Sequence, residues 1–176
     1  MIFTETPLQG AFIVDIEGRE DIRGFFARTF CREEFAKLGL KADLAQCSIS
    51  LNKHKGTLRG MHFQLAPREE VKIVRCTRGA IYDVIIDLRP QSPTYCRWSA
   101  VELTEDNHRA LYVPPGFAHG FQTLSMISEV FYQMTEFYAP ELARGVRWDD
   151  PVFGIKWPII NPILSEKDAN FAAFKP

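Results

Sequence analysis

The chain has 176 residues, of which 46% are apolar and 12% aromatic, as in a globular protein with one hydrophobic core, so we expect a single domain over residues 1–176. Its formal net charge of −1 argues against a nucleic-acid or membrane-surface partner. No apolar run is long enough to cross a bilayer, and MIFTETPLQG lacks signal-peptide features. Four scattered cysteines without a Cys-x-x-Cys pair are typical of reduced thiols, which favours a cytoplasmic protein.

The predicted elements are mostly short strands. Along the chain, β-branched and aromatic runs predict strands at 11–16, 71–76, 80–88, 97–103, 110–115 and 129–138. A helix is expected over 32–40, closed by Gly39, and a second short one after Ser165, where the sequence SEKD offers an N-cap serine. Many short strands separated by turn signals predict an all-β, jelly-roll type barrel with one or two short peripheral helices.

The stretch GTLRGMHFQ, residues 56–64, mixes strand-forming and polar side chains. Because strand side chains alternate between two faces, His62 and Gln64 should point the same way. Three roles are open for His62 at this stage: a structural histidine of the core, a metal ligand or a catalytic base. Arg59 lies three residues before His62, so both can face one ligand only if the strand is bulged, for which Gly60 is the expected place, or if Arg59 lies at the end of the strand.

This stretch and the later VPPGFAHGFQ, residues 113–122, resemble the two motifs of the cupin barrel. Metal-binding cupins carry His-x-His and a glutamate in the first motif. Here Gln64 replaces the second histidine, and Glu69 and Glu70 fall in a predicted polar turn. An amide oxygen is a poor substitute for imidazole at a transition-metal site, so we expect no metal.

Ten motifs in order carry a closer resemblance. They are RGFF (23–26), LRGMHFQ (58–64), KIVR (72–75), YDVIIDLR (82–89), SPT (92–94), PPGFAHGF (114–121), the Tyr132 strand, WDDP (148–151), IKWP (155–158) and LSEKD (164–168). Together they resemble the dTDP-4-dehydrorhamnose 3,5-epimerases over nearly the whole chain. The resemblance implies a cupin-like jelly-roll homodimer that epimerises a nucleotide-diphosphate 4-keto-6-deoxyhexose without metal or cofactor.

The resemblance also implies roles for particular residues. His62 matches the base that removes the α-proton, Asp168 its carboxylate partner, Lys72 the cation near the carbonyl oxygen and Tyr132 the acid on the opposite face. Arg23 and Arg59 match diphosphate-binding positions, and Tyr138 matches an aromatic residue that stacks on the nucleobase. The full set of implied substrate-binding residues is Arg23, Phe26, Arg28, Gln46, Ser48, Arg59, Asp83, His119, Tyr138 and Lys167.

Each residue also has an ordinary structural interpretation. Tyr132 suits the apolar side of a strand, Lys72 a solvent-facing position, and Asp168 the first turn of a surface helix. Arg59 could form a surface ion pair. Asp83 differs, because a lone acid inside an apolar strand should be paired.

Three positions depart from the family pattern: Arg28 and Ala143 replace glutamates, and Ser48, in a segment QCS that we interpret as a loop, replaces an asparagine. All three belong to the nucleotide side of the family's site, so the identity of the nucleobase remains open: thymine bound differently or another nucleobase. Epimerisation at one centre and at two centres would use the same catalytic base, so the number of inverted carbons also remains open. A metal-dependent cupin enzyme and a non-catalytic sugar-binding barrel are the alternatives from other classes.

Overall fold

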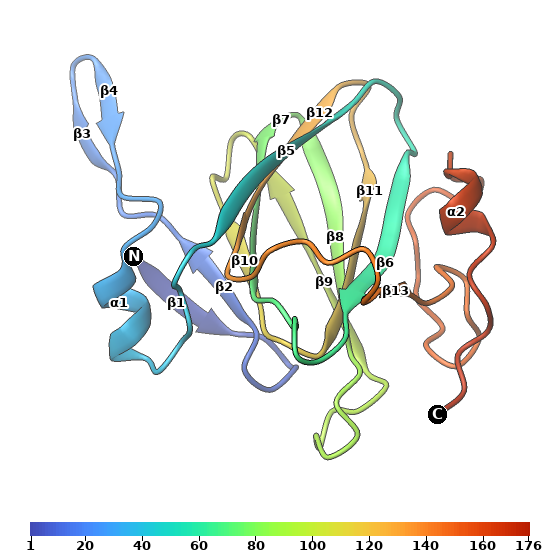
Figure 1. The fold of residues 1–176 in the computed structure, drawn as a ribbon. Coiled ribbons are helices and arrows are strands. Elements are labelled where there is room, and N and C mark those ends of the chain that lie inside the picture. The colour runs from blue at the N-terminus through green and yellow to red at the C-terminus, as the bar shows by residue number, and fades with distance from the viewer.

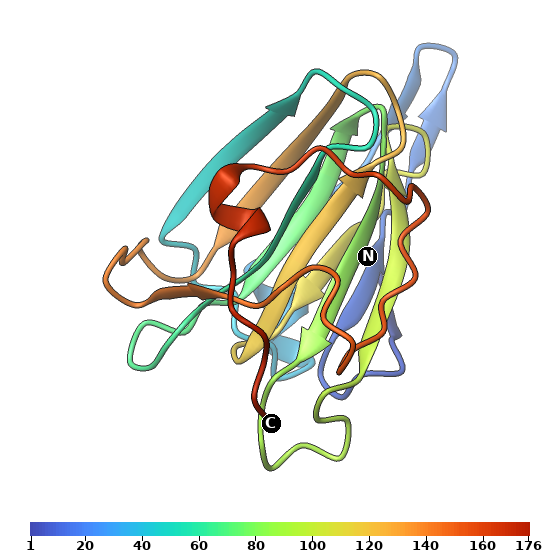
Figure 2. The same ribbon diagram turned by 90° about the vertical axis from the view of Figure 1, so that its right-hand side faces the viewer.

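The computed structural model describes residues 1–176 and consists of two antiparallel sheets packed face to face (Figures 1 and 2). The six-stranded sheet runs in the order β1 (Ile2–Glu5), β2 (Phe12–Asp15), β10 (Ala110–Val113), β7 (Lys72–Arg78), β12 (Ser128–Met134) and β5 (Gln46–Asn52). The five-stranded sheet runs in the order β13 (Ala143–Gly145), β6 (Leu58–Gln64), β11 (Phe117–Thr123), β8 (Ala80–Asp87) and β9 (Trp98–Thr104). From β5 onward the chain changes sheet at every connection except β8–β9, which is the jelly-roll arrangement that the sequence predicted.

The main core lies between the two sheets. Val74 and Val130 from the six-stranded sheet meet Ile85 and Phe121 from the five-stranded sheet, and all four side chains are buried. Because strand residues alternate between faces, every second position of these strands enters the core. Towards one end of the sandwich the inward positions become polar, and there the core gives way to a cavity.

Two short helices flank the sheets, as predicted. α1 (Arg32–Lys37) buries Phe35 and is followed by Gly39 at φ +69°, a left-handed conformation that glycine adopts without strain. α2 (Glu166–Ala169) starts at Ser165, whose hydroxyl accepts a hydrogen bond from the Asp168 amide, and it contacts β6 beside the five-stranded sheet (Figure 2). Their six and four residues are far too few to cross a bilayer.

A hairpin of β3 (Arg19–Asp21) and β4 (Gly24–Phe26) projects away from the sandwich (Figure 1). All six strand residues are exposed, and Ile22 at its turn is fully exposed. Because apolar side chains gain stability by leaving water, this hairpin presents a surface suited to contact with another molecule.

Two of the differences between predicted and observed boundaries concern the cavity, and the predicted helix over 32–40 ends earlier, at Lys37. QCS, interpreted as a loop, is the start of β5; its polar residues Gln46 and Ser48 face the cavity, so the segment lacks the apolar alternation of a core strand. The strand predicted over 129–138 ends at Met134, and the following residues leave the sheet as a loop beside the cavity. Aromatic residues at 137 and 138 favoured strand locally, but both are exposed in that loop.

Candidate active site

A polar cavity of about 590 Å³ opens between the two sheets. Its walls come from β5, β7 and β12 on one side and β6 and β11 on the other, with the β12–β13 loop, β13 and α2 at the rim. Its volume is that of a small-molecule site. Four cations line it, Arg59, Lys72, Arg144 and Lys167, against one carboxylate, Glu70, so the cavity favours an anionic ligand.

An irregularity in β6 turns both Arg59 and His62 into the cavity. β6 pairs His62 with His119 of β11 but Arg59 with Phe121, so three residues of β6 span two of β11. Gly60 lies within this extra step and has φ +142°, a conformation that other residues rarely adopt. The bulge predicted at Gly60 is therefore confirmed, and it explains how residues three apart reach one face.

His62 is paired with Asp168. Nε2 of His62 lies 2.7 Å from Oδ1 of Asp168, and the amide of Gly60 donates to Oδ2 at 3.4 Å. Burial opposes ionisation of Asp168, but the hydrogen bond from His62, with help from the charge of that ring, lowers the pKa of the carboxyl. The ionised carboxylate fixes the ring, and Nδ1 of His62 forms no hydrogen bond within the chain.

Phe171, which the sequence interpretation missed, also holds the His62 ring. It packs edge-on against the imidazole with ring centres 5.8 Å apart. Gly145 of β13 makes room for it, because a Cβ there would overlap the Phe171 ring. The C-terminal segment carries no local pattern that points to such a role, since the contact exists only when the chain end folds back onto β6.

The opposite wall carries Tyr132 from β12, which faces His119 of β11 on the same wall as His62. The ring centres of Tyr132 and His119 are 6.1 Å apart, and Nε2 of His119 lies 2.8 Å from Oδ1 of Asp83. Asp83 is therefore paired, as its position in an apolar strand required. Burial raises the pKa of Asp83 despite the nearby His119 and Lys72. Burial, followed by the charge of Asp83, raises the pKa of Tyr132, which keeps the phenol protonated.

Lys72 is buried, with 8% of its surface exposed, and is not the solvent-facing charge of the ordinary interpretation. Its ammonium donates to the carbonyl oxygen of His62 at 3.2 Å and pairs with Oε1 of Glu70, also at 3.2 Å. Glu70 precedes β7 and was assigned to a polar turn. It is two residues from Lys72 in extended chain, so the two side chains share a side, and this Glu-x-Lys spacing was the available signal.

Other predicted substrate-binding residues lie around the cavity. Arg59 donates through Nε to Oδ1 of Asn52 at 2.7 Å, which fixes its guanidinium. Gln46 accepts from the amide of Tyr138 at 3.1 Å, so β5 anchors the loop that carries this half-exposed aromatic ring. The cavity thus brings together the predicted residues Gln46, Ser48, Arg59, His62, Lys72, His119, Tyr132, Tyr138 and Lys167, with Asp83 and Asp168 directly behind the two histidines.

Three predicted residues are not brought to this cavity within the chain. Arg23 lies at the turn of the β3–β4 hairpin, which projects from the sandwich (Figure 1). Arg23 pairs with Asp21, and Phe26 on β4 is 77% exposed. Arg28 follows the hairpin and lies 3.0 Å from Glu34. None of the three lines the cavity of its own chain.

The donor groups do not fit a metal ion. Gln64 accepts from the Ala139 amide at 2.7 Å and donates to two loop carbonyls, so its amide holds the loops beside the cavity. Both histidines direct Nε2 at a carboxylate, and no three His, Cys, Asp or Glu side chains form a ligand set.

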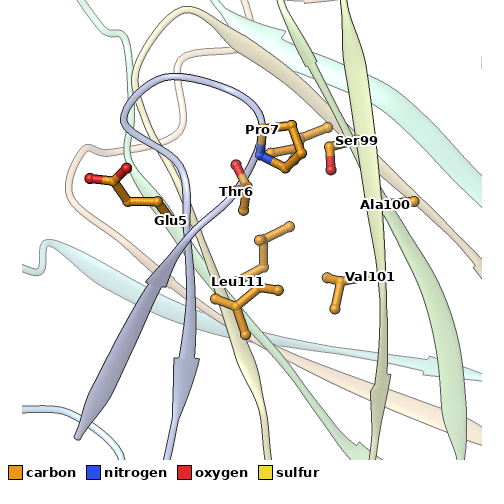
Figure 3. Close-up of a pocket in the computed structure, with 9 residues that line it drawn as sticks. Glu5, Thr6, Pro7, Ser99, Ala100, Val101 and Leu111 are labelled. Atoms are coloured by element: carbon orange, nitrogen blue, oxygen red, sulfur yellow. The ribbon is translucent and has the colours of Figure 1, made fainter.

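A second cavity of about 220 Å³ lies between β9 and the turn after β1 (Figure 3). Pro7, Val101 and Leu111 give it an apolar lining, and Glu5, its only ionisable residue, turns its carboxylate away from the centre. It lacks the acid–base groups of the larger cavity.

The fold and the larger cavity are those of a cupin-type jelly-roll epimerase that acts on carbohydrates. The family model for dTDP-4-dehydrorhamnose 3,5-epimerase matches residues 5–176, and the chain belongs to that family. It is 46% identical to the dTDP-4-dehydrorhamnose 3,5-epimerase of Sinorhizobium fredii, over 85% of this chain and 77% of that protein.

Two solved structures show the same architecture. The dTDP-4-dehydrorhamnose 3,5-epimerase of Bacillus anthracis, with TDP and PPi bound, superposes with a TM-score of 0.95 at 39% identity, covering 98% of this chain and 99% of that one. A 3′-monoepimerase from Streptomyces bikiniensis, in complex with dTDP-quinovose, has a TM-score of 0.88 at 32% identity, covering 96% and 85%.

Proposed function

We propose that this protein epimerises a nucleotide-diphosphate 4-keto-6-deoxyhexose at C3 and C5, converting dTDP-4-dehydro-6-deoxyglucose to dTDP-4-dehydrorhamnose for deoxysugar and polysaccharide biosynthesis. One observation carries the proposal: the His62–Asp168 pair and the Tyr132 phenol lie on opposite walls of one cavity, with the Lys72 ammonium in it. Inversion next to a ketone needs a base on one face of the sugar, an acid on the other and a cation for the enolate.

In this scheme Nδ1 of His62 takes the α-proton. Asp168 accepts a hydrogen bond from Nε2, which leaves the Nδ1 lone pair available, and its negative charge stabilises the imidazolium that forms. The electrons of the C–H bond move into the enolate, whose oxygen is stabilised by Lys72.

Tyr132 then returns a proton to the carbon from the other face, which inverts the centre. A phenol with a raised pKa is fully protonated at neutral pH and is still a much stronger acid than the α-carbon. His119, held by Asp83, lies beside Tyr132 and can bind the sugar hydroxyls.

The cations near the rim support binding of the diphosphate, with Arg59 and Lys167 as its partners and Tyr138 stacked on the base. Thymine is favoured by the TDP and dTDP-quinovose bound in the two similar structures. Because Arg28, Ser48 and Ala143 depart from the family pattern, the identity of the nucleobase needs a direct test. Arg28→Glu should change the preference among dTDP, UDP, CDP and GDP if Arg28 reads the base, and weaken all four alike if it serves the diphosphate.

We further propose a single-domain, cytoplasmic homodimer in which each β3–β4 hairpin completes the cavity of the other subunit. Arg23 and Phe26 would then meet the substrate that they cannot reach in their own chain. The outer face of edge strand β5 exposes Ile49 and Leu51, which supports a subunit contact beside the cavity. The four cysteines are free thiols, consistent with a reducing compartment.

The decisive experiment follows deuterium uptake from heavy water into C3 and C5 of dTDP-4-dehydro-6-deoxyglucose. Uptake and inversion at both carbons support the two-centre reaction. Uptake at C3 alone would establish the second candidate, a single-centre epimerase, which the similarity to a 3′-monoepimerase favours. Tight nucleotide binding without any uptake would instead support a non-catalytic sugar-binding barrel.

A further inference from the structure

Glu70 is the one carboxylate among the side chains that line a cavity with four cations. A negative charge weakens the binding of a diphosphate, so its presence in an anion site needs a reason. Its side chain is only 10% exposed and faces the ammonium of Lys72 rather than solvent.

The contacts of Lys72 supply that reason. An ammonium group has three donors, and here one meets the His62 carbonyl and another the Glu70 carboxylate, each at 3.2 Å. Two fixed acceptors leave a single donor for the ligand. They also tie the ammonium to the backbone of the same residue that carries the proposed base, His62.

A lysine without such anchors would behave differently. Its four-carbon chain is flexible and its charge is compact, so the diphosphate bound in the same cavity would attract it. An ammonium drawn to the phosphates would no longer lie beside the sugar carbonyl, where the negative charge of the enolate develops.

We propose that Glu70 is a positioning residue that holds the Lys72 ammonium at the sugar carbonyl and away from the diphosphate. This inference rests on the proposed epimerase function. It assigns Glu70 no contact with the reacting atoms, and its effect on the rate passes through Lys72.

The test uses the full-length protein and the isosteric variant Glu70→Gln. We expect kcat for proton exchange to fall about tenfold, a fraction of the 10²–10³ that one donor to a developing oxyanion supplies. The Kd for dTDP should stay equal or become a few-fold tighter, because a negative charge leaves an anion site. Glu69→Gln, the same charge change at the exposed neighbouring acid outside the cavity, should leave both unchanged.

A double-mutant cycle with Lys72→Ala decides whether Glu70 acts through Lys72. In the Lys72→Ala background, Glu70→Gln should change kcat by less than about twofold. An equal tenfold loss in both backgrounds, or an unchanged kcat in the single variant, would overturn the inference. A weaker Kd for dTDP with unchanged kcat would make Glu70 a binding residue instead. Melting curves check that each variant is folded, and a wild type without exchange would overturn the proposed function itself together with this inference.

Discussion

At the scale of single residues, His62 is fixed by a carboxylate, a backbone bulge and an aromatic ring. Asp168 holds Nε2, the extra residue in β6 turns the side chain inward, and Phe171 packs against the imidazole. A histidine that only filled the core would need none of these. The ring is instead restrained in position while Nδ1 stays free, which suits a general base.

Replacing His62 with Asn should therefore lower deuterium exchange at both carbons by about 10²–10⁴-fold, the usual contribution of a general base. Affinity for dTDP should stay within about tenfold, because the residues proposed to bind the diphosphate and the nucleobase are unchanged. His54→Asn, at an exposed histidine outside the cavity, is the matched control and should keep full exchange. Exchange retained in His62→Asn would move the base elsewhere, with His119 as the next candidate.

Tyr132 and His62 belong to different sheets, so their effects should separate. Tyr132→Phe removes the proposed proton donor of one wall and leaves the proposed base, His62, of the other intact. We expect this variant to exchange the α-proton but to return deuterium to the original face, which nuclear magnetic resonance would detect as uptake without inversion. Equal loss of uptake and inversion would show that Tyr132 positions the sugar instead of protonating it.

At the scale of elements, the turn between β8 and β9 is organised around one buried carboxylate. Asp87, at the end of β8, accepts hydrogen bonds from Arg89, Ser92 and Thr94. Burial alone would raise its pKa, but these hydrogen bonds lower the pKa of Asp87 from 3.8 to about 2. The sequence segments DLR and SPT thus form one structural unit, which holds the turn and makes no contact with the cavity.

This unit predicts acid sensitivity. Because the folded-state pKa of Asp87 lies below the unfolded value, its stabilisation is complete above pH 4 and is lost as the pH falls towards 2. The shift corresponds to roughly 2 kcal/mol. Asp87→Asn should lower the free energy of unfolding by at least that order at pH 7, with a smaller difference from wild type at pH 2–3, measured by urea titration. Asp106→Asn, at an exposed acid, is the control, and a gap between Asp87→Asn and wild type that does not depend on pH would contradict the assignment.

At the scale of the whole molecule, the proposed exchange of hairpins makes each site a product of two chains. Subunits with His62→Asn and subunits with Arg23→Ala should each be impaired alone. In a mixed dimer, the Arg23→Ala subunit keeps an intact cavity and receives an intact hairpin from its partner, so one of the two sites is restored.

Co-expression of the two variants should therefore recover about a quarter of wild-type activity, since half of randomly formed dimers are mixed and each has one good site. Co-expression of His62→Asn with Tyr132→Phe is the control. Each chain then carries a change in its own cavity, so no dimer contains a complete site. No recovery in the first mixture would show that the hairpin serves its own chain or no site at all.

The strand-rich architecture and both short helices follow from the sequence, because alternation, turn residues and capping patterns are local properties. Most cavity residues were predicted from the resemblance of ten sequence motifs to one family. Side-chain parity left two ways for Arg59 and His62 to share a face, a bulge at Gly60 or Arg59 at the end of the strand, and the register of β6 against β11 shows the bulge. Which side chains meet depends on the tertiary fold. The pairing of Asp168 with His62 joins residues 106 positions apart. The contacts of Phe171 with His62 and of Glu70 with Lys72 depend on how the loops and the C-terminal segment pack against the sheets. The tertiary fold also placed Arg23, Phe26 and Arg28 outside the cavity of their own chain, because the position of a hairpin relative to the two sheets is a tertiary property that no local sequence pattern records.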